Sequence, residues 1–97
     1  MRIEEEGTKF SWDEDTRQEV LRQRGVGILD AALVFEGVTL TKIDTGKDYG
    51  EERYISLGLV DDVPFIVVHT RRGDRVRLIR AWKGGAKEYE HYKNRIP

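Results

Sequence analysis

The chain has 97 residues, of which 38% are hydrophobic and 36% are charged, and its formal net charge at pH 7 is −1. This length predicts one domain over residues 1–97 with a single modest core, and the absence of cysteine excludes disulfides and thiolate zinc sites. Residues 1–7 are acidic and lack an apolar stretch, which predicts a flexible N-terminus without an ordinary secretion signal. No window approaches the roughly 18 apolar residues of a membrane span. We therefore expect a soluble, cytoplasmic protein without membrane contact.

The first third of the chain predicts a short strand and two helices. Larger and polar side chains alternate over residues 8–12, which is typical of a strand. Asp13 is suited to cap a helix that Gly25 would end. A second, short helix is expected over residues 28–36, with four side chains facing inward: Leu29, Ala32, Leu33 and Phe35.

After Gly37 the period changes from helical to alternating. Four strands are predicted, over residues 38–43, 53–60, 63–70 and 75–82. A polar loop at 44–50 separates the first two strands, short turns join the others, and a helix is expected over 86–94. Three consecutive strands joined by short turns must form an antiparallel meander. The predicted fold is therefore α+β: two N-terminal helices, an antiparallel sheet of about four strands, and a C-terminal helix.

Positive charge is concentrated near the C-terminus. Residues 71–87 hold seven of the seventeen cations and one acid, whereas the first 36 residues hold nine acids and five bases. A nearly neutral chain polarised in this way is suited to an anionic partner, and nucleic acid is the first candidate. The alternative interpretation is a solvated strand whose arginines pair with the N-terminal acids.

Arg53 and Arg77 are the candidate cations for catalysis. Each lies next to apolar positions on its own strand face, so its guanidinium group is expected to be partly shielded and to need an acid or a phosphate. Strict alternation in the last strand separates two sets, Arg75, Arg77, Ile79 and Ala81 against Val76, Leu78, Arg80 and Trp82. Two arginines facing a common groove would stabilise the phosphorane of RNA cleavage. Singly, each would be a structural ion pair.

Two other features could carry chemistry. The loop that precedes the strand at 53–60 places acids and a phenol around Gly50, and such loops often hold binding groups. The alternative is that Gly50 only makes a turn while Glu51 or Glu52 pairs with Arg53 across neighbouring strands. His69 could act as a general base near neutral pH, or it could be a hydrogen-bonded strand histidine. Because the two histidines of the chain lie far apart without ligand spacing, we expect no metal and no other cofactor.

Fragments spread over about residues 9–92 carry a family resemblance. In the first half they are FSWDE at 10–14, GV at 25–26, and Ala32 with Phe35. In the second half they are DYGEERYISLG at 48–58, VVHTR at 67–71, and DRVRLI at 74–79 with Ala81. Together they resemble the BrnT toxins. The resemblance implies a ribonuclease toxin of a type II toxin–antitoxin system with a RelE-like fold.

The resemblance also implies partners and roles. RNA would be the substrate, and a DNA-binding antitoxin, BrnA, would neutralise the toxin and bring it into indirect contact with DNA. RNA cleavage needs no metal in this hypothesis, because the 2′-hydroxyl supplies the nucleophile and charged side chains do the rest. Arg53 and Arg77 would stabilise the phosphate, and Glu51, Lys47 or His69, in that order, would carry the proton.

Five residues are expected to hold the RNA: Tyr49, Arg71, Arg75, Arg80 and Lys83. The alternative is a non-catalytic module that keeps the fold and binds RNA or a protein partner without cleaving RNA. This alternative gains weight because the chain departs from the usual BrnT pattern at five positions: Thr16, Val20, Arg24, Lys47 and Trp82. An arginine usually stands where this chain has Trp82, and Arg80 or Lys83 could replace its charge.

Overall fold

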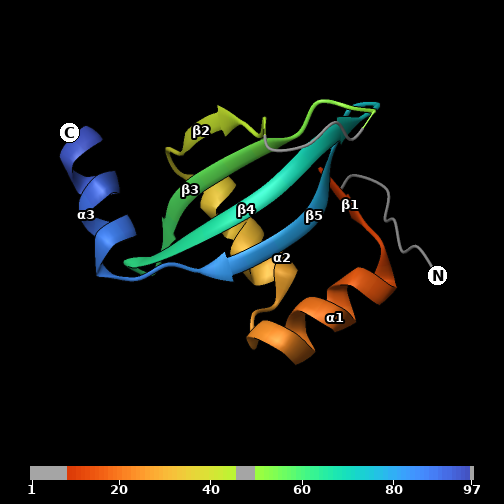
Figure 1. Ribbon diagram of the computed structural model, residues 1–97, viewed down its shortest axis with the longest axis horizontal. Coiled ribbons are helices and arrows are strands. Elements are labelled where there is room, and N and C mark those ends of the chain that lie inside the picture. Colours follow the sequence, from red (N-terminus) through yellow and green to blue (C-terminus); the bar gives the residue numbers. More distant parts are fainter. Residues whose placement is uncertain (1–8, 46–49, 97) are drawn as a thin grey trace.

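The computed structural model describes residues 9–45 and 50–96 (Figure 1). The elements in chain order are β1 (Phe10–Trp12), α1 (Glu14–Arg24), α2 (Ile28–Ala31), the 3₁₀ helix η1 (Ala32–Glu36), β2 (Leu40–Ile43), β3 (Tyr54–Val60), β4 (Val63–Arg72), β5 (Arg75–Lys83) and α3 (Ala86–Arg95). The predicted α+β class is confirmed. None of the helices in these ranges is long and apolar enough to cross a membrane.

The strands form one mixed sheet in the order β1-β5-β4-β3-β2. β2 to β5 pair antiparallel, as the meander predicted, but β1 pairs in parallel with β5, with Trp12 opposite Leu78. The expectation of about four strands, all antiparallel, was therefore wrong. A parallel pair needs a long crossover, and here the helices and the meander between β1 and β5 supply it. The pattern of a three-residue strand does not indicate its partner.

Local signals set the limits of α1 as predicted. Asp13 Oδ1 accepts hydrogen bonds from two backbone N–H groups of the first turn, at 2.9 and 3.3 Å. Gly25 ends the helix with φ of 66°, a left-handed conformation that suits glycine, and its N–H donates to the carbonyl oxygen of Leu21 at 2.9 Å. The buried residue of α1 is Val20.

The second helix differs from the prediction. It is α-helical for one turn and then tightens into η1, and its buried residues are Ile28, Ala31, Ala32 and Val34. Ala32 thus faces inward as predicted and Phe35 packs at the edge of the core, whereas Leu29 and Leu33 are 40% and 44% exposed. Because apolar residues occur all around this segment, its period alone could not select a face. Gly58 determines which face turns inward. A Cβ at this position would lie 2.7 Å from Val34 Cβ, so η1 packs directly on the backbone of β3.

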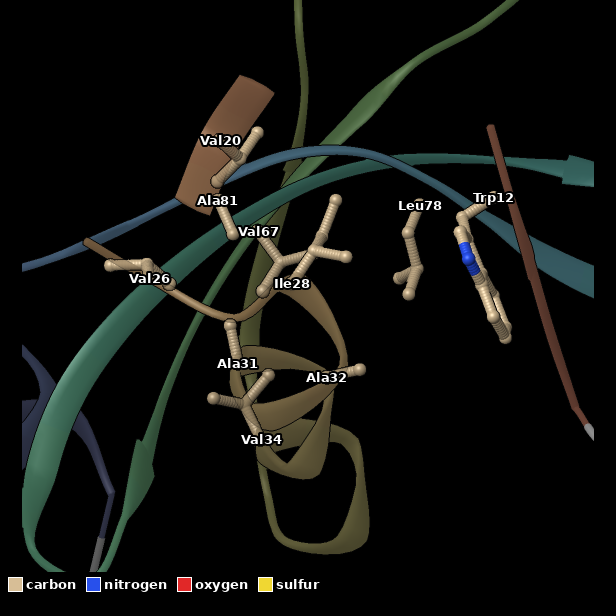
Figure 2. Close-up of a cluster of buried hydrophobic side chains, with 10 residues drawn as sticks. All are labelled: Trp12, Val20, Val26, Ile28, Ala31, Ala32, Val34, Val67, Leu78 and Ala81. Carbon is tan, nitrogen blue, oxygen red and sulfur yellow. The ribbon is translucent and has the colours of Figure 1, made fainter. Parts of the chain in front are cut away.

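The core lies between α2–η1 and one face of the sheet (Figure 2). Ile28 and Val34 come from the helical side, and Val67, Leu78 and Ala81 come from β4 and β5. Full burial of an aliphatic side chain of this size stabilises a fold by about 1.5–3 kcal/mol. This face is called the covered face below, and the other is called the open face.

A β-bulge in β5 decides which residues share a face. Leu78 and Arg80 lie opposite consecutive residues of β4, so Ile79 has no cross-strand partner. Leu78 and Ala81 therefore both enter the core, although strict alternation predicts opposite faces for them. Arg77 and Arg80 consequently share the open face, and the predicted separation of these two arginines was wrong.

α3 closes the end of the sheet away from the β4–β5 turn (Figure 1). Its N-terminus is capped by Glu88, whose carboxylate accepts a hydrogen bond from the N–H of Gly85 at 2.7 Å. Tyr92 is buried and donates its hydroxyl to the carbonyl oxygen of Val38 at 2.6 Å. Beside α3, a row of apolar side chains on the open face, Leu40, Leu57, Ile66 and Trp82, lines a cavity of about 430 Å³.

Candidate active site

Several of the predicted site residues meet near the β4–β5 turn. In the ladder at this end, Tyr54 lies opposite His69 and Thr70 lies opposite Arg77. Because side chains alternate along a strand, Tyr54 and His69 lie on the covered face and Arg77 lies on the open face. The candidates from the sequence are thus divided between the two faces of one sheet end.

On the covered side, a cavity of about 260 Å³ is lined by Thr41, Tyr54, His69, Thr70, Arg71 and Val76. It brings together two residues that were expected to do different work, His69 as a proton carrier and Arg71 as an RNA-binding cation. Tyr54 and Thr41 also line it, and the sequence had not indicated either of them as a site residue. Arg71 is exposed, so its guanidinium group is available to a phosphate at the mouth of the cavity.

The imidazole ring of His69 is held by three neighbours. Its Nε2 lies 2.7 Å from Ser56 Oγ. The ring stacks on Tyr54 with 5.8 Å between centroids, and it meets Phe35 edge-on at 4.9 Å. Burial lowers the pKa of His69 below its ordinary value of 6.5, because desolvation disfavours the imidazolium. His69 is therefore neutral at neutral pH, which is the form that a general base requires.

Ser56 continues the contacts of His69 toward the edge of the sheet. Its hydroxyl is fully buried, and Oγ also lies 2.7 Å from Thr41 Oγ1 on β2. Thr41 Oγ1 in turn lies 3.2 Å from Thr39 Oγ1. Three hydroxyl groups thus extend from the half-buried imidazole to the solvent-exposed strand β2.

Tyr54 remains a protonated phenol in this site. Its hydroxyl donates a hydrogen bond to the carboxylate of Glu52. This bond raises the pKa of Tyr54 above its ordinary value, burial raises it further, and the charge of Arg71 acts in the opposite direction. The ring of Tyr54 is thereby held in place beside His69.

Arginines gather on the open face at the same sheet end. Arg77 lies opposite Thr70 on β5, Arg53 directly precedes β3 on the other side of β4, and both arginines are half-buried. The carboxylate of Glu51 forms ion pairs with two of the arginines. Its Oε2 lies 3.4 Å from Arg53 Nε, and its Oε1 lies 3.4 Å from Arg72 Nη2. The ion pair between Glu51 and Arg53 that the sequence offered as an alternative is therefore present.

The residues expected to hold RNA are spread over several surfaces. Arg71 lines the covered-side cavity and Arg75 lies on the open face opposite Arg72. Arg80 lines a separate cavity of about 380 Å³ between α1 and β5, and Lys83 lies at the far end of β5 opposite Phe65. Two further candidates, Lys47 and Tyr49, lie outside the described residues.

Four of the positions at which the chain departs from the BrnT pattern lie together. Thr16, Val20 and Arg24 follow one another at helical spacing along α1 and line the cavity that also contains Arg80. The guanidinium carbon of Arg24 lies 5.4 Å from the centre of the Trp82 ring, a cation–π contact. These four departures therefore change the interface of α1 with β5 and are not among the described residues that line the cavity with His69.

Over residues 9–45 and 50–96, no group of three or more histidine, aspartate or glutamate side chains is arranged to hold a metal ion. What these residues do offer is a neutral imidazole and a guanidinium group in one cavity of a small α+β domain. A proton acceptor and a guanidinium group in one cavity are chemically suited to the cleavage of a phosphodiester bond.

The family model for the ribonuclease toxin BrnT of type II toxin–antitoxin systems matches residues 12–88, and the chain belongs to this family. The resemblance drawn from the sequence fragments is thereby confirmed. Membership implies RNA as the substrate and an antitoxin as the partner. No curated protein matches the chain.

Proposed function

We propose that this protein is an endoribonuclease that cleaves RNA without a metal ion in the cavity lined by His69 and Arg71. The observation that carries the proposal is the meeting of these two side chains in one cavity of about 260 Å³. The family supplies the substrate class. The lowered pKa of His69 supplies a base that is ready at neutral pH.

In the proposed reaction, the 2′-oxygen of a ribose attacks the adjacent phosphorus, and its proton passes to the neutral imidazole of His69. The bond from phosphorus to the 5′-oxygen then breaks, and the 5′-oxygen takes up a proton from His69. The products are a 2′,3′-cyclic phosphate and a 5′-hydroxyl. Arg71 stabilises the charge that develops on the phosphate oxygens, and Tyr54 keeps the imidazole oriented through the ring stack.

The open-face arginines receive a different role. Arg53 and Arg77 lie on the face opposite His69, so one phosphate cannot contact all three side chains. We assign them to the RNA backbone outside the cavity, where cations add affinity that depends on salt. In the rival assignment, which follows the expectation from the sequence, Arg53 and Arg77 hold the cleaved phosphate and Glu51 or Lys47 carries the proton.

Neutralisation by a DNA-binding antitoxin of the BrnA type completes the proposal, with DNA contacted only through that partner in the cytoplasm. Support comes from the family alone. An open reading frame next to this one should encode a protein with a DNA-binding motif. Co-expression of the two should yield a complex in which RNA cleavage is suppressed.

The test is incubation of the purified protein with total RNA in excess chelator, with His69→Ala and His91→Ala as paired variants. His91 is an exposed histidine on α3, so its removal controls for a general loss of imidazole. We expect cleavage by the parent protein and by His91→Ala, and a loss of about 10²–10⁴-fold in His69→Ala. Intact RNA that is bound in a salt-sensitive manner would instead favour the non-catalytic module.

A further inference from the structure

The hydroxyl group of Ser56 is a buried polar group in the sheet, at 0% exposure. A hydroxyl without partners at such a site would be strongly unfavourable, so its contacts define its role. Both contacts are short: Oγ lies 2.7 Å from His69 Nε2 and 2.7 Å from Thr41 Oγ1. Ser56 therefore connects the proposed general base to another proton-carrying group.

The strand register explains why these groups line up. Thr41 lies directly opposite Ser56 in the β2–β3 ladder, and His69 is the diagonal neighbour of Ser56 on β4. All three side chains occupy the covered face, one on each of three adjacent strands. Thr39, two residues before Thr41, continues the row at 3.2 Å. The row ends at Thr41 on the edge strand β2, where this residue is exposed to water, and at Thr39 just before the strand.

Each hydroxyl in the row both donates and accepts a hydrogen bond. When Nε2 of His69 carries the proton, it donates a hydrogen bond to Ser56. The hydroxyl of Ser56 then donates to Thr41, and the hydroxyl of Thr41 donates to Thr39. Nδ1 is then the nitrogen that accepts a proton from a bound molecule. Within the described ranges, the ring makes its hydrogen bond through Nε2. Tyr54 and Arg71 are the titratable and charged groups beside the ring, whereas η1 and β5 present Phe35 and Leu78.

We propose that Ser56, Thr41 and Thr39 form a proton relay that connects His69 with solvent at the β2 edge of the sheet. The relay rests on the proposed nuclease function and adds to it. A proton taken from the 2′-hydroxyl enters at Nδ1, a proton leaves from Nε2 to Ser56, and each hydroxyl passes one proton onward to water. The imidazole is then neutral with its proton on Nδ1. It gives that proton to the 5′-oxygen while the relay returns a proton from water to Nε2, so the starting tautomer is restored and no atom is oxidised or reduced. Ser56 acts as a positioning residue that selects this tautomer.

The experiment uses the whole chain with ¹⁵N-labelled histidine and measures, by NMR without RNA, the tautomer of His69 and the exchange rate of its ring N–H. Thr41→Val keeps the shape of an exposed residue but removes the hydroxyl, and Ser56→Ala removes the central link. Ser11→Ala is the matched control, because Ser11 is also a buried serine but lies on β1 opposite Arg77.

We expect the parent protein and Ser11→Ala to hold one tautomer, protonated at Nε2. Ser56→Ala should give a mixture of tautomers. Thr41→Val should slow ring N–H exchange by about ten-fold, the scale of one lost hydrogen bond. Exchange and tautomer unchanged in both variants would overturn the relay.

The cleavage assay separates this result from the parent proposal. If the parent protein leaves RNA intact while Thr41→Val slows ring exchange, the relay stands and the nuclease assignment fails. If the parent cleaves RNA and ring exchange is the same in all variants, the nuclease assignment stands and the relay fails.

Discussion

The two faces of the sheet end near the β4–β5 turn hold different kinds of charge. Among the residues that the structure describes, the covered face presents His69 with one cation, Arg71, among aromatic rings. The open face presents a group of arginines around the carboxylate of Glu51. Charge density in the sequence draws attention to the open face. The covered face has fewer charges, but its partial exclusion of water lowers the pKa of His69, and the proposed reaction depends on that change.

The two faces also differ in the roles proposed for their cations. On the covered face, Arg71 would stabilise the charge that develops on the phosphate during the reaction, whereas on the open face Arg53 and Arg77 would contact backbone phosphates through interactions that weaken as salt rises. We therefore expect substitutions on the covered face to change the rate of cleavage, and substitutions on the open face to change affinity and its dependence on salt.

The largest difference between the faces should appear in Arg71→Ala against Arg77→Ala. Loss of a cation that stabilises the developing charge should lower single-turnover cleavage by about 10²–10³-fold in Arg71→Ala. Arg77→Ala should weaken RNA binding and reduce the slope of log affinity against log salt by about 1. Single-turnover kinetics and binding titrations at several salt concentrations give both quantities. The reverse order of effects would move the reaction to the open face.

Substitutions on the two faces should also differ in how much they lower the free energy of unfolding. Leu78→Ala empties a position that is 1% exposed on the covered face and should lower the free energy of unfolding by about 2–5 kcal/mol. Leu57→Ala removes a half-buried side chain on the open face and should cost less than half as much. Urea denaturation followed by circular dichroism measures the two values. Equal losses would show that the open face is packed as tightly as the core.

The pH dependence of the covered site tests the burial of His69. Its pKa is lowered on folding, so above the unfolded pKa of about 6.5 both states are neutral and contribute no difference. As the pH falls below that value, the unfolded chain binds the proton first, and stability is lost until the folded pKa is passed. Cleavage should therefore stay near its maximum at pH 6.5 and fall at lower pH. An acid limb centred above pH 6.5 in the pH–rate profile would contradict a desolvated imidazole.

The smallest effect is expected from Glu51→Gln on the open face. Ion pairs that keep contact with solvent contribute about 0–1 kcal/mol, and the side chains of Glu51 and Arg53 are 28% and 21% exposed, so the melting temperature should change little. RNA affinity at low salt should rise, because Arg53 and Arg72 lose a competing carboxylate. A fall in cleavage by orders of magnitude would instead identify Glu51 as the proton carrier that the sequence ranked first.

Most of the element order was predictable because its signals are local. Caps at Asp13 and Gly25 define α1, and the two-residue turn Asp61-Asp62, with φ of 50° and 65°, joins β3 to β4. The parallel pairing of β1 was not predictable, because partner choice depends on the whole sheet. The inward face of α2–η1 was not predictable either, because it depends on close packing against Gly58, which has no Cβ.

The sequence predicted which residues belong to the site better than it predicted how these residues are arranged. His69 and Arg71 were both candidates, and a spacing of two residues puts them on one face of a strand. The predicted strand ended at residue 70, however, and nothing local indicated the cavity. A sharper signal was present for Tyr54 and Ser56, because a two-residue turn fixes the register of β3 against β4 and so sets Tyr54 opposite His69. The same argument fails for the arginines of β5. The extra residue at the bulge moves every later side chain of the strand to the opposite face.

That extra residue has a consequence for how the strand tolerates change. On the two sides of Ile79, β5 consists of segments whose side-chain phase differs by one position. Deleting Ile79 would join Leu78 to Arg80 in a regular ladder and would leave every other side chain of the strand pointing as it does now. The chain could thus be shortened by one residue at this position. The deletion would remove the packing of one isoleucine against α1, and the remaining side chains of β5 would keep their faces of the sheet.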